Sequence, residues 1–515
     1  MLGNYRFGLR DEGHPPARVP SKLDRVIPRR SFAWKPVTAV AVLVVLLLLP
    51  LSSRYDYHRD ELYFRILGRH LQWGYVDQPP LVPLLSRMSI AVFGDSLWAI
   101  RVPGALLLAA MAFLTALIAR EVGGAAVGQT LAASAVFGTF PLVGGHVGNT
   151  QLPDLLAWLG VLYFLLRVLL RGSERSWLGV GVVTGLALYA KLLIPLLLIC
   201  LLLALLVVGP RRVLLSRWLL AGAGLAVLIG LPNILYQVFN DFPQAHMADA
   251  IAADKGTDSR IQLLPFQLIL IGLALVPVWV AGFVTLVRDP RLRAARSIAV
   301  AYPIMVVLVF VTAGQPYYPI GLVLGLFAIG AVPVERWMAG RAGRRVLLGV
   351  AVGVNLVISV VFALPVLPVS QVGFIAAVNS TVADQIGWNV YVRQVAAVYT
   401  ALPADEQQRA VLFTSNYGEA GALDRYGAAY RLPAVYSGHN ELWNYGPPPD
   451  SRTVAIVVSQ APAAEVNATL GRCDLKAQLD NGLGIENEEP DGAIYVCRNL
   501  PAPWHTLWPG LQHYD

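Results

Sequence analysis

Charged residues are scarce in this chain. Asp, Glu, Lys and Arg make up only 14% of its 515 residues, whereas 56% are hydrophobic, and the mean hydropathy is +0.57. A soluble globular protein carries about 25% charged residues, so this composition excludes an ordinary soluble domain. The net charge of +8 is spread over many short basic segments. Because these segments form no single aromatic-interleaved patch, the sequence gives no support for nucleic-acid binding.

Cysteine is also rare. The chain has three, and two cysteines in one domain are by themselves weak evidence for a disulfide. Cys200 lies within a strongly apolar run, where we expect a small buried hydrophobe. Cys473 and Cys497 lie in the more polar C-terminal part, and the sequence leaves open whether they pair.

Long apolar runs are abundant. The first of them follows residues 1–35 without an obvious small-residue cleavage site, so we expect it to stay in the protein as a helix. Several runs are long enough to cross a hydrocarbon core about 30 Å thick, among them Val37–Leu51, Leu97–Ala119, Leu192–Val208 and Val346–Leu367. The sequence therefore predicts a polytopic α-helical membrane protein with about 11 transmembrane helices. These are expected to begin near Val37, Leu97, Ala125, Leu152, Trp177, Leu192, Trp218, Leu264, Ser297, Tyr318 and Val346.

The distribution of Lys and Arg predicts how the chain crosses the membrane. Every second connection between the apolar runs is basic, which places the N-terminus and those connections in the cytoplasm. This alternation requires an odd number of spans, with a break in the apolar stretch at Lys191. We expect a basic cytoplasmic extension at residues 1–35, a transmembrane domain at 36–367 and an extracytoplasmic domain at 368–515.

Residues 368–515 differ in character from the rest. Short apolar strands alternate there with turn-rich polar segments, a pattern typical of a small α/β domain. Asn416–Gly421 and Gly438–Asn440 are predicted to be tight loops. The expected strands are Ala410–Thr414, Thr453–Ser459 and Ala493–Cys497, and the expected helices are Val390–Leu402 and Glu419–Tyr430.

Two adjacent carboxylates, Asp60 and Glu61, follow the first apolar run on the predicted outer face. Ionised side chains at such a boundary are costly unless they line a polar cavity or bind a ligand, so this pair is a candidate functional site. Lys191 lies between two apolar runs, where it either binds an anion or extends to the interface. Asp154 opens the fourth predicted span, and its position also suits an acid in the first turn of a helix.

Several short motifs occur in one order along the chain. They are Arg59-Asp60-Glu61-Leu62-Tyr63, Gly74-Tyr75-Val76-Asp77-Gln78-Pro79-Pro80-Leu81, Pro153-Asp154, Tyr189-Ala190-Lys191 and Pro316-Tyr317-Tyr318-Pro319. The ordered set resembles the dolichyl-phosphate-mannose protein mannosyltransferase-like glycosyltransferases of family 39, whose relatives include the lipid A aminoarabinose transferases.

The resemblance implies the GT-C fold and a membrane glycosyltransferase. Such an enzyme moves a sugar from a polyprenyl-phosphate donor to an acceptor on the outer face, which is a glycan, a lipid or a protein hydroxyl. It implies Asp60 as the general base, with Glu61 in support, and Asp154 as a residue that positions hydroxyl groups. The richness in Ala, Val, Gly, Arg and Leu indicates a high-GC bacterium, so we expect a multi-pass protein of the bacterial cytoplasmic membrane.

The resemblance also suggests binding residues. Lys191 is the main candidate for the donor phosphate, and Asp77-Gln78-Pro79-Pro80 stands where the aminoarabinose relatives carry Glu-Lys-Pro-Pro, so one lysine is missing here. A divalent cation held by Asp77, His246 and Asp60 is a further hypothesis. The other candidates are Arg59, Arg260 and Gln78 for the phosphate, and Tyr63, Tyr317, Tyr318 and His439 for the sugar or acceptor, although aromatic residues are also common at membrane interfaces.

Two other classes of protein fit parts of this pattern. A transporter or flippase for lipid-linked sugars would also have many spans, broken helices and a buried cation. Its binding site would lie near the middle of the membrane, whereas the polar groups here gather on one face, and the sequence shows no internal repeat. A non-catalytic envelope scaffold is the third alternative, and it would tolerate the loss of Asp60.

Overall fold

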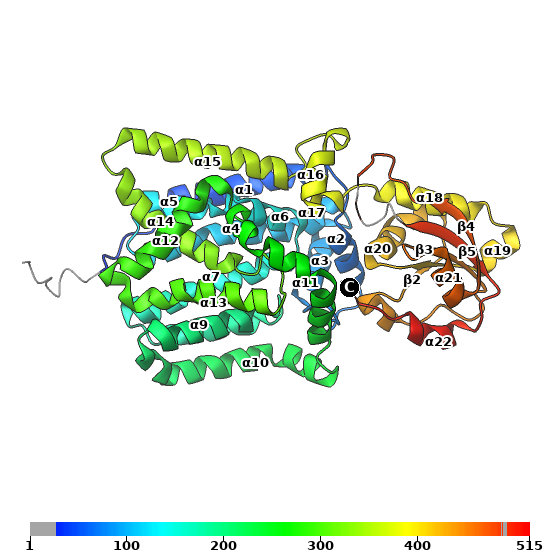
Figure 1. Cartoon of the computed structure of the whole chain (residues 1–515), viewed down its shortest axis with the longest axis horizontal. Coiled ribbons are helices and arrows are strands. Elements are labelled where there is room, and N and C mark those ends of the chain that lie inside the picture. The colour runs from blue at the N-terminus through cyan, green and yellow to red at the C-terminus, as the bar shows by residue number, and fades with distance from the viewer. Residues whose placement is uncertain (1–26, 486, 488–491, 515) are drawn as a thin grey trace, which may run out of the picture.

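The computed structural model describes residues 27–485, 487 and 492–514, so most of the predicted extension at 1–35 lies outside the described residues. It has a long bundle of helices with a sheet domain at one end (Figure 1). The described chain begins at the other end, where Arg171 donates a hydrogen bond to the Ile27 carbonyl. The predicted fold class, a helical membrane domain followed by an α/β domain, is confirmed.

Seven helical segments of the described chain are long and apolar enough to span a membrane, or up to nine if two bent pairs each count as one. The bent pairs are Ala126–Phe137 with Thr139–Val147, and Lys255–Ile269 with Leu273–Arg288. The seven are α1 (Trp34–Leu51), α4 (Leu97–Glu121), α7 (Gln151–Arg171), α10 (Arg217–Phe239), Pro290–Val311, α14 (Ile320–Met338) and α15 (Ala342–Ala363).

The remaining two predicted spans are shorter helices. α8 (Ser176–Ala187) has 12 residues and α9 (Ile194–Val208) has 15. At about 1.5 Å per residue, neither alone reaches the roughly 30 Å of a hydrocarbon core. The chain breaks between them at the turn that contains Lys191, as the charge pattern predicts. The charge pattern divides this apolar stretch into two predicted spans but does not show that each half is too short to span a membrane alone.

Gly272 makes the second bent pair possible. It lies between α11 (Pro243–Ile269) and α12 (Val276–Arg288) with a φ of 118°, a conformation that L side chains rarely adopt. The neighbouring Ile271 carbonyl accepts a hydrogen bond of 2.9 Å from Asn355 Nδ2 of α15. The Asn355 side chain therefore supplies a hydrogen bond to a backbone carbonyl at the bend, where the helical hydrogen bonds are interrupted.

The sheet domain has five strands in the order β2-β1-β3-β5-β4. β1 (Ala410–Thr414) pairs in parallel with β2 (Val435–Ser437) and β3 (Val454–Ser459), whereas β5 (Ala493–Arg498) is antiparallel to both β3 and β4 (Arg472–Gln478). The three predicted strands are confirmed. The sequence missed β2, which has only three residues, and β4, whose polar residues give no apolar signal.

Two helices of the sheet domain correct or refine the sequence prediction. α18 (Trp388–Thr400) begins two residues before the predicted start. α20 (Tyr417–Tyr426) includes most of the segment predicted as a loop at Asn416–Gly421. Asn416 is the N-cap, and its side chain and that of Glu419 form a reciprocal capping box. Gly and Asn stand there because a helix begins, so the loop prediction for that segment is wrong.

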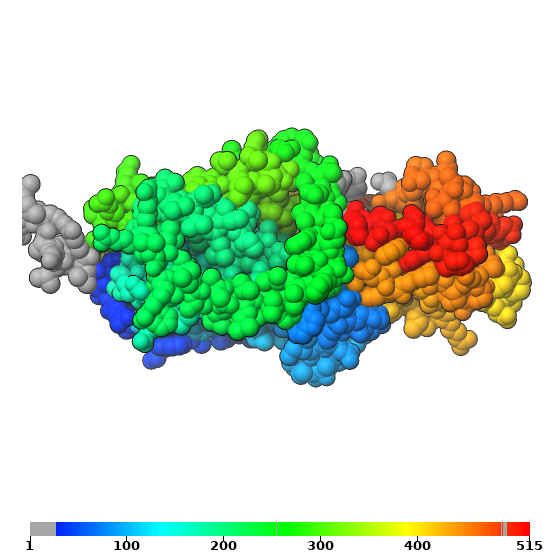
Figure 2. All heavy atoms as spheres, turned by 90° about the horizontal axis from the view of Figure 1, so that it is seen from below, coloured from blue at the N-terminus to red at the C-terminus, as the bar shows by residue number. Residues whose placement is uncertain are grey.

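α20 crosses α2 (Arg59–Leu67), which joins the sheet domain to the helical part. A Cβ on Gly421 would lie 2.6 Å from the Cβ of Leu62, so only glycine allows the two helices to approach this closely. In Figure 2 the red C-terminal segment lies against the green part of the chain near α11. The sheet domain is therefore packed on the same end of the bundle as α2, as Figure 1 also shows.

Cys473 and Cys497 form a disulfide between β4 and β5, where the strand register places them opposite each other. Cys200 is buried in α9. Closing a loop of 24 residues restricts the unfolded chain, so reducing this disulfide is expected to lower the free energy of unfolding of the sheet domain by about 3 kcal/mol. Thermal unfolding of the Cys473→Ser and Cys497→Ser double variant measures this, with Cys200→Ala as the control. An unchanged transition temperature in the double variant would contradict the expectation.

Candidate functional site

A cavity of about 350 Å³ lies where the helical part meets the sheet domain. Its walls come from α2, the loop at 68–80, Thr150 just before α7, the turn at 188–193, α11, the loop at 312–319 and the first residue of α20. The lining residues that carry charge or hydrogen-bonding side chains are Arg59, Asp60, Tyr63, Asp77, Gln78, Thr150, Lys191, Gln244, Lys255, Gln315, Tyr317, Tyr318 and Tyr417. Segments far apart in the sequence thus share one polar cavity.

The start of α2 aims Asp60 and Glu61 in different directions. His58 is the N-cap, and its imidazole Nδ1 accepts the Asp60 N–H at 3.2 Å. Glu61 Oε2 accepts the His58 N–H at 2.8 Å and completes a capping box. The Asp60 side chain is 32% exposed and lines the cavity, whereas that of Glu61 is 1% exposed and does not.

Glu61 is engaged with Arg101 of α4. Its two carboxylate oxygens accept hydrogen bonds from Arg101 Nε and Nη2, both at 2.8 Å. The same guanidinium donates to the carbonyls of Ser52 and Asp56, which belong to the connection between α1 and α2. Glu61 therefore fixes the position of α2, and the structure places it away from the cavity in which the sequence predicts it to support Asp60.

The side chains of Tyr417 and His58 contact or approach the Asp60 carboxylate. Tyr417 Oη donates a hydrogen bond of 2.9 Å to Asp60 Oδ1, and His58 Nδ1 lies 3.8 Å from Asp60 Oδ2. Burial raises the pKa of Tyr417 well above its usual value, so its hydroxyl stays neutral and can donate. Arg59 lies 4.5 Å above the Tyr417 ring. The carboxylate thus faces the cavity with one oxygen held by the sheet domain.

In the part of the chain that the structure describes, three cationic side chains line the cavity. The Lys191 Nζ donates to Tyr317 Oη at 3.4 Å and lies 5.2 and 5.6 Å from the ring centres of Tyr317 and Tyr318. Lys255 of α11 and Arg59 of α2 are the others. The sequence predicts Lys191 and Arg59 for this environment but misses Lys255.

Arg260 is not brought to the cavity. It follows Lys255 by five residues, which turns it by about 140° around α11. It is exposed, and its Nε donates a hydrogen bond of 3.1 Å to the Phe310 carbonyl. The helical register of α11 therefore selects Lys255 in place of the predicted Arg260 as the cation that faces the cavity.

Asp77 and Gln78 line the same cavity from the loop at 68–80. Burial raises the pKa of Asp77 to about 7, and the nearby Glu441 carboxylate adds to this shift. Glu441 in turn accepts hydrogen bonds from Gln72 Nε2 at 2.9 Å and from the Val76 N–H at 3.0 Å. Glu441 of the sheet domain thus holds the loop at 68–80 in place through these hydrogen bonds.

The predicted metal set of Asp60, Asp77 and His246 is not assembled. His246 is exposed and lies 3.6 Å from Asp241, and it does not line the cavity. The residues of α11 that do line it are Gln244, Met247, Ala248, Ile251 and Lys255, a helical spacing that turns residue 246 outward. Within the described ranges, no group of three or more His, Cys, Asp or Glu side chains is arranged to hold a metal ion.

Some of the other predicted site residues line the cavity, and others lie outside it. Tyr63, Tyr317 and Tyr318 line it. His439 is buried behind Tyr417, with the two rings stacked at 4.9 Å and Nδ1 accepting the Tyr417 N–H at 3.1 Å. Asp154 is also buried outside the cavity and accepts a hydrogen bond of 3.1 Å from Trp158 Nε1. Neither His439 nor Asp154 lines the cavity.

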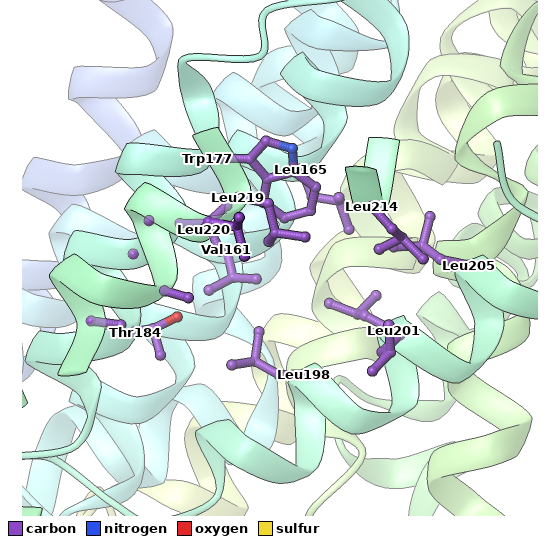
Figure 3. Close-up of a pocket in the computed structure, with 16 residues that line it drawn as sticks. Val161, Leu165, Trp177, Thr184, Leu198, Leu201, Leu205, Leu214, Leu219 and Leu220 are labelled. Atoms are coloured by element: carbon purple, nitrogen blue, oxygen red, sulfur yellow. The ribbon is translucent and has the colours of Figure 1, made fainter. Parts of the chain in front are cut away.

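A second cavity, of about 380 Å³, has almost purely apolar walls. Figure 3 shows leucine side chains of α9 and α10 around it, together with Trp177 and Thr184 of α8. It lies between α7, α8, α9 and α10. Such a space suits a hydrocarbon chain.

Comparison with known proteins places this geometry in context. Residues 77–236 match the family model of the dolichyl-phosphate-mannose-protein mannosyltransferases. The crystal structure of ArnT from Cupriavidus metallidurans in the apo state matches with a TM-score of 0.60 at 14% identity, over 90% of this chain and 98% of ArnT. This chain has the GT-C fold of ArnT.

The likeness to ArnT includes the sheet domain as well as the helices, because it extends over nearly the whole of both chains. The structure of ArnT bound to undecaprenyl phosphate matches with a TM-score of 0.55 at 15% identity, over 89% of this chain and 97% of ArnT. Among curated protein sequences, none matches this chain.

Proposed function

We propose that this protein is a membrane glycosyltransferase that moves a sugar from a polyprenyl-phosphate donor to an acceptor hydroxyl, with Asp60 as the general base. One observation carries the proposal. Asp60 shares a single cavity with Arg59, Lys191 and Lys255, at the end of the helical bundle on which the sheet domain sits. A carboxylate opposite several cations suits a reaction in which a proton is removed and a phosphate leaves.

In the proposed reaction, Asp60 accepts the proton of the acceptor hydroxyl as its oxygen attacks the anomeric carbon of the sugar. The bond between that carbon and the phosphate oxygen breaks, and the electron pair leaves with the lipid phosphate. The attack comes from the face opposite the leaving group, so the configuration inverts. Tyr417 donates a hydrogen bond to Asp60 Oδ1, so we assign Oδ2, which lies 3.8 Å from His58 Nδ1, as the oxygen that takes the proton.

The departing phosphate gains negative charge, and fixed positive charges lower the energy of that transition state. Lys191, Lys255 and Arg59 are the cations that line the cavity. A divalent cation, the further hypothesis from the sequence, would act on the same charge. Asp154 lies outside the cavity, so any effect on sugar hydroxyls would be indirect, and its role as a positioning residue stays a prediction.

The polyprenyl chain needs an apolar environment. ArnT has been determined with undecaprenyl phosphate bound, and this chain shares its fold. The apolar cavity between α7, α8, α9 and α10 offers space for hydrocarbon within the bundle (Figure 3). We therefore assign the lipid chain to the helical part and the phosphate to the polar cavity.

The proposed side of the reaction is extracytoplasmic. The disulfide between Cys473 and Cys497 suits an oxidising compartment, and it lies in the sheet domain, which contributes Tyr417 to the cavity. Arg171 and Arg291 lie near Ile27 at the opposite end, which the positive-inside rule favours as cytoplasmic. The proposed location is the bacterial cytoplasmic membrane, with the N-terminus inside.

Replacing Lys191 or Lys255 by Ala tests the phosphate site. Each change is expected to weaken binding of labelled undecaprenyl phosphate to the purified protein by at least about tenfold, because each removes a charge-assisted contact. Arg260→Ala is the matched control, since it removes a cation from α11 that does not reach the cavity. Equal losses in all three variants would mean that general surface charge, and not the cavity, attracts the phosphate.

A further inference from the structure

Three side-chain amides in or against the polar cavity have atoms without a hydrogen-bond partner among the described residues. They are Gln78 Nε2, Gln244 Nε2 and Asn440 Oδ1, each buried and each unpartnered among the described residues. Nearly all buried polar groups in folded proteins are hydrogen-bonded, and leaving one unpaired costs about 1–3 kcal/mol. Three such atoms in one neighbourhood indicate that something polar completes their bonding.

These amides belong to one place in the molecule. Gln78 follows Asp77 in the chain, and both line the cavity, with the Gln78 residue as a whole only 7% exposed; Gln244 of α11 lines the same cavity. Asn440 comes from the sheet domain, and its Nδ2 donates a hydrogen bond of 3.4 Å to Asp77 Oδ2. Asn440 does not itself line the cavity, but its contact with Asp77 places it directly against the cavity wall. Two amide donors in the cavity and one amide acceptor at its wall therefore accompany the Asp77 carboxyl group.

The chemistry of these groups suits sugar hydroxyls. A hydroxyl both donates and accepts a hydrogen bond, so it can pair with amide N–H groups and amide oxygens alike. A phosphate accepts only, and it would be repelled by the carboxyl groups of Asp77 and Glu441, which lie close together. The cations that suit a phosphate, Lys191 and Lys255, line the cavity from other elements.

We propose that Gln78, Gln244 and Asn440, together with Asp77, form a subsite that holds the hydroxyl groups of the sugar carried by the polyprenyl phosphate. This inference rests on the proposed glycosyltransferase function. In this proposal Gln78 binds a sugar hydroxyl and not the phosphate, for which the sequence suggests it. Asp77 likewise binds a sugar hydroxyl and not a metal ion. Through Asn440, the sheet domain also takes part in choosing the sugar.

The backbone around Asn440 holds this residue in an unusual conformation. Its φ is 49°, and its N–H donates a hydrogen bond of 3.0 Å to the His513 carbonyl. Asn adopts such a positive φ more readily than most residues, and Asp does so as well. Asn440→Asp therefore keeps the backbone while replacing the amide by a carboxylate, which makes it a suitable test variant.

The test compares two lipids on each variant. Binding of the polyprenyl-phosphate sugar that the wild type turns over, chosen from hexose and pentose donors, is measured beside binding of undecaprenyl phosphate without sugar. Gln78→Leu and Asn440→Asp are each expected to weaken binding of the sugar-bearing lipid by about tenfold. Binding of undecaprenyl phosphate without sugar is expected to stay unchanged. The matched control is Lys191→Ala, which is expected to weaken both lipids.

Several outcomes would overturn the inference. One is that both test variants bind the sugar-bearing lipid as the wild type does, and another is that they lose both lipids equally. A raised KM for the acceptor with unchanged donor binding would move the subsite to the acceptor and would also overturn it. Retained binding of the bare lipid shows that the variants are folded. If the proposed function itself fails, the wild type turns over none of the donors, a result that differs from all of these.

Discussion

Replacing Asp60 by Asn is expected to lower the rate of sugar transfer by about 10²- to 10⁴-fold, the usual contribution of a general base. Asn keeps the size of the side chain and can still accept the hydrogen bond from Tyr417 Oη. It cannot take a proton from the acceptor hydroxyl. Binding of undecaprenyl phosphate should therefore change little while turnover is lost, and both are measured on the same purified preparation.

The matched control for this variant is Asp384→Asn. Asp384 is another acid of the same neighbourhood, with its Oδ2 3.6 Å from His58 Nε2, but it does not line the cavity. We expect less than a tenfold loss of turnover from this change, because it alters the electrostatic surroundings of His58 and, at longer range, of the cavity, but leaves the proposed base in place. If both variants lost turnover equally, or if Asp60→Asn retained it, Asp60 would not be the base.

Replacing Glu61 by Gln is expected to lower the free energy of unfolding by about 3–5 kcal/mol, as is usual when one partner of a buried ion pair is removed. Both side chains of the Glu61–Arg101 pair are 1% exposed, so the guanidinium would be left buried without its counter-charge. Arg101 also contacts His146 and Gln385, and it therefore ties α4 and α6 (Thr139–Val147) to the connection that leads into the sheet domain.

Glu406→Gln is the control for this prediction. Glu406 pairs with Arg498 at 2.7 Å, but the two side chains are partly exposed, so its loss should cost about 1 kcal/mol or less. Thermal or denaturant unfolding of the purified variants measures the difference. A Glu61→Gln variant as stable as Glu406→Gln, yet without turnover, would return Glu61 to the supporting catalytic role that the sequence suggests.

The general fold and the location of the site could be predicted from the sequence because each leaves a local signal. Apolar length gives the spans, and the strand Ala410–Thr414 stands out as a short buried run. Asp60 and Lys191 are prominent because ionised groups are rare beside apolar runs. Both line the cavity that the structure reveals.

The missing parts of the site depend on geometry that no local pattern contains. Lys255 and Arg260 lie five residues apart on α11, and only the rotation of that helix decides which one faces the cavity. Tyr417 reaches Asp60 across 357 positions of the chain. Its segment looks like a turn because the cap at Asn416 and the close crossing at Gly421 use the same residue types as loops.

The role of Glu61 illustrates a different limit. Adjacent carboxylates suggest one shared function, yet successive helical residues point about 100° apart, and here one faces the cavity and the other faces Arg101. A capping box usually begins with Ser or Thr, whereas this one begins with His58, so its signature is absent from the sequence.

The most direct test of the central claim is the release of polyprenyl phosphate by the purified full-length protein. A panel of polyprenyl-phosphate hexoses and pentoses serves as donor, and cell-envelope extract serves as acceptor. We predict that at least one donor is consumed, with its sugar recovered in the extract and its lipid phosphate set free. No release from any donor, despite saturable binding of undecaprenyl phosphate, would contradict the account and favour a lipid transporter or a non-catalytic scaffold.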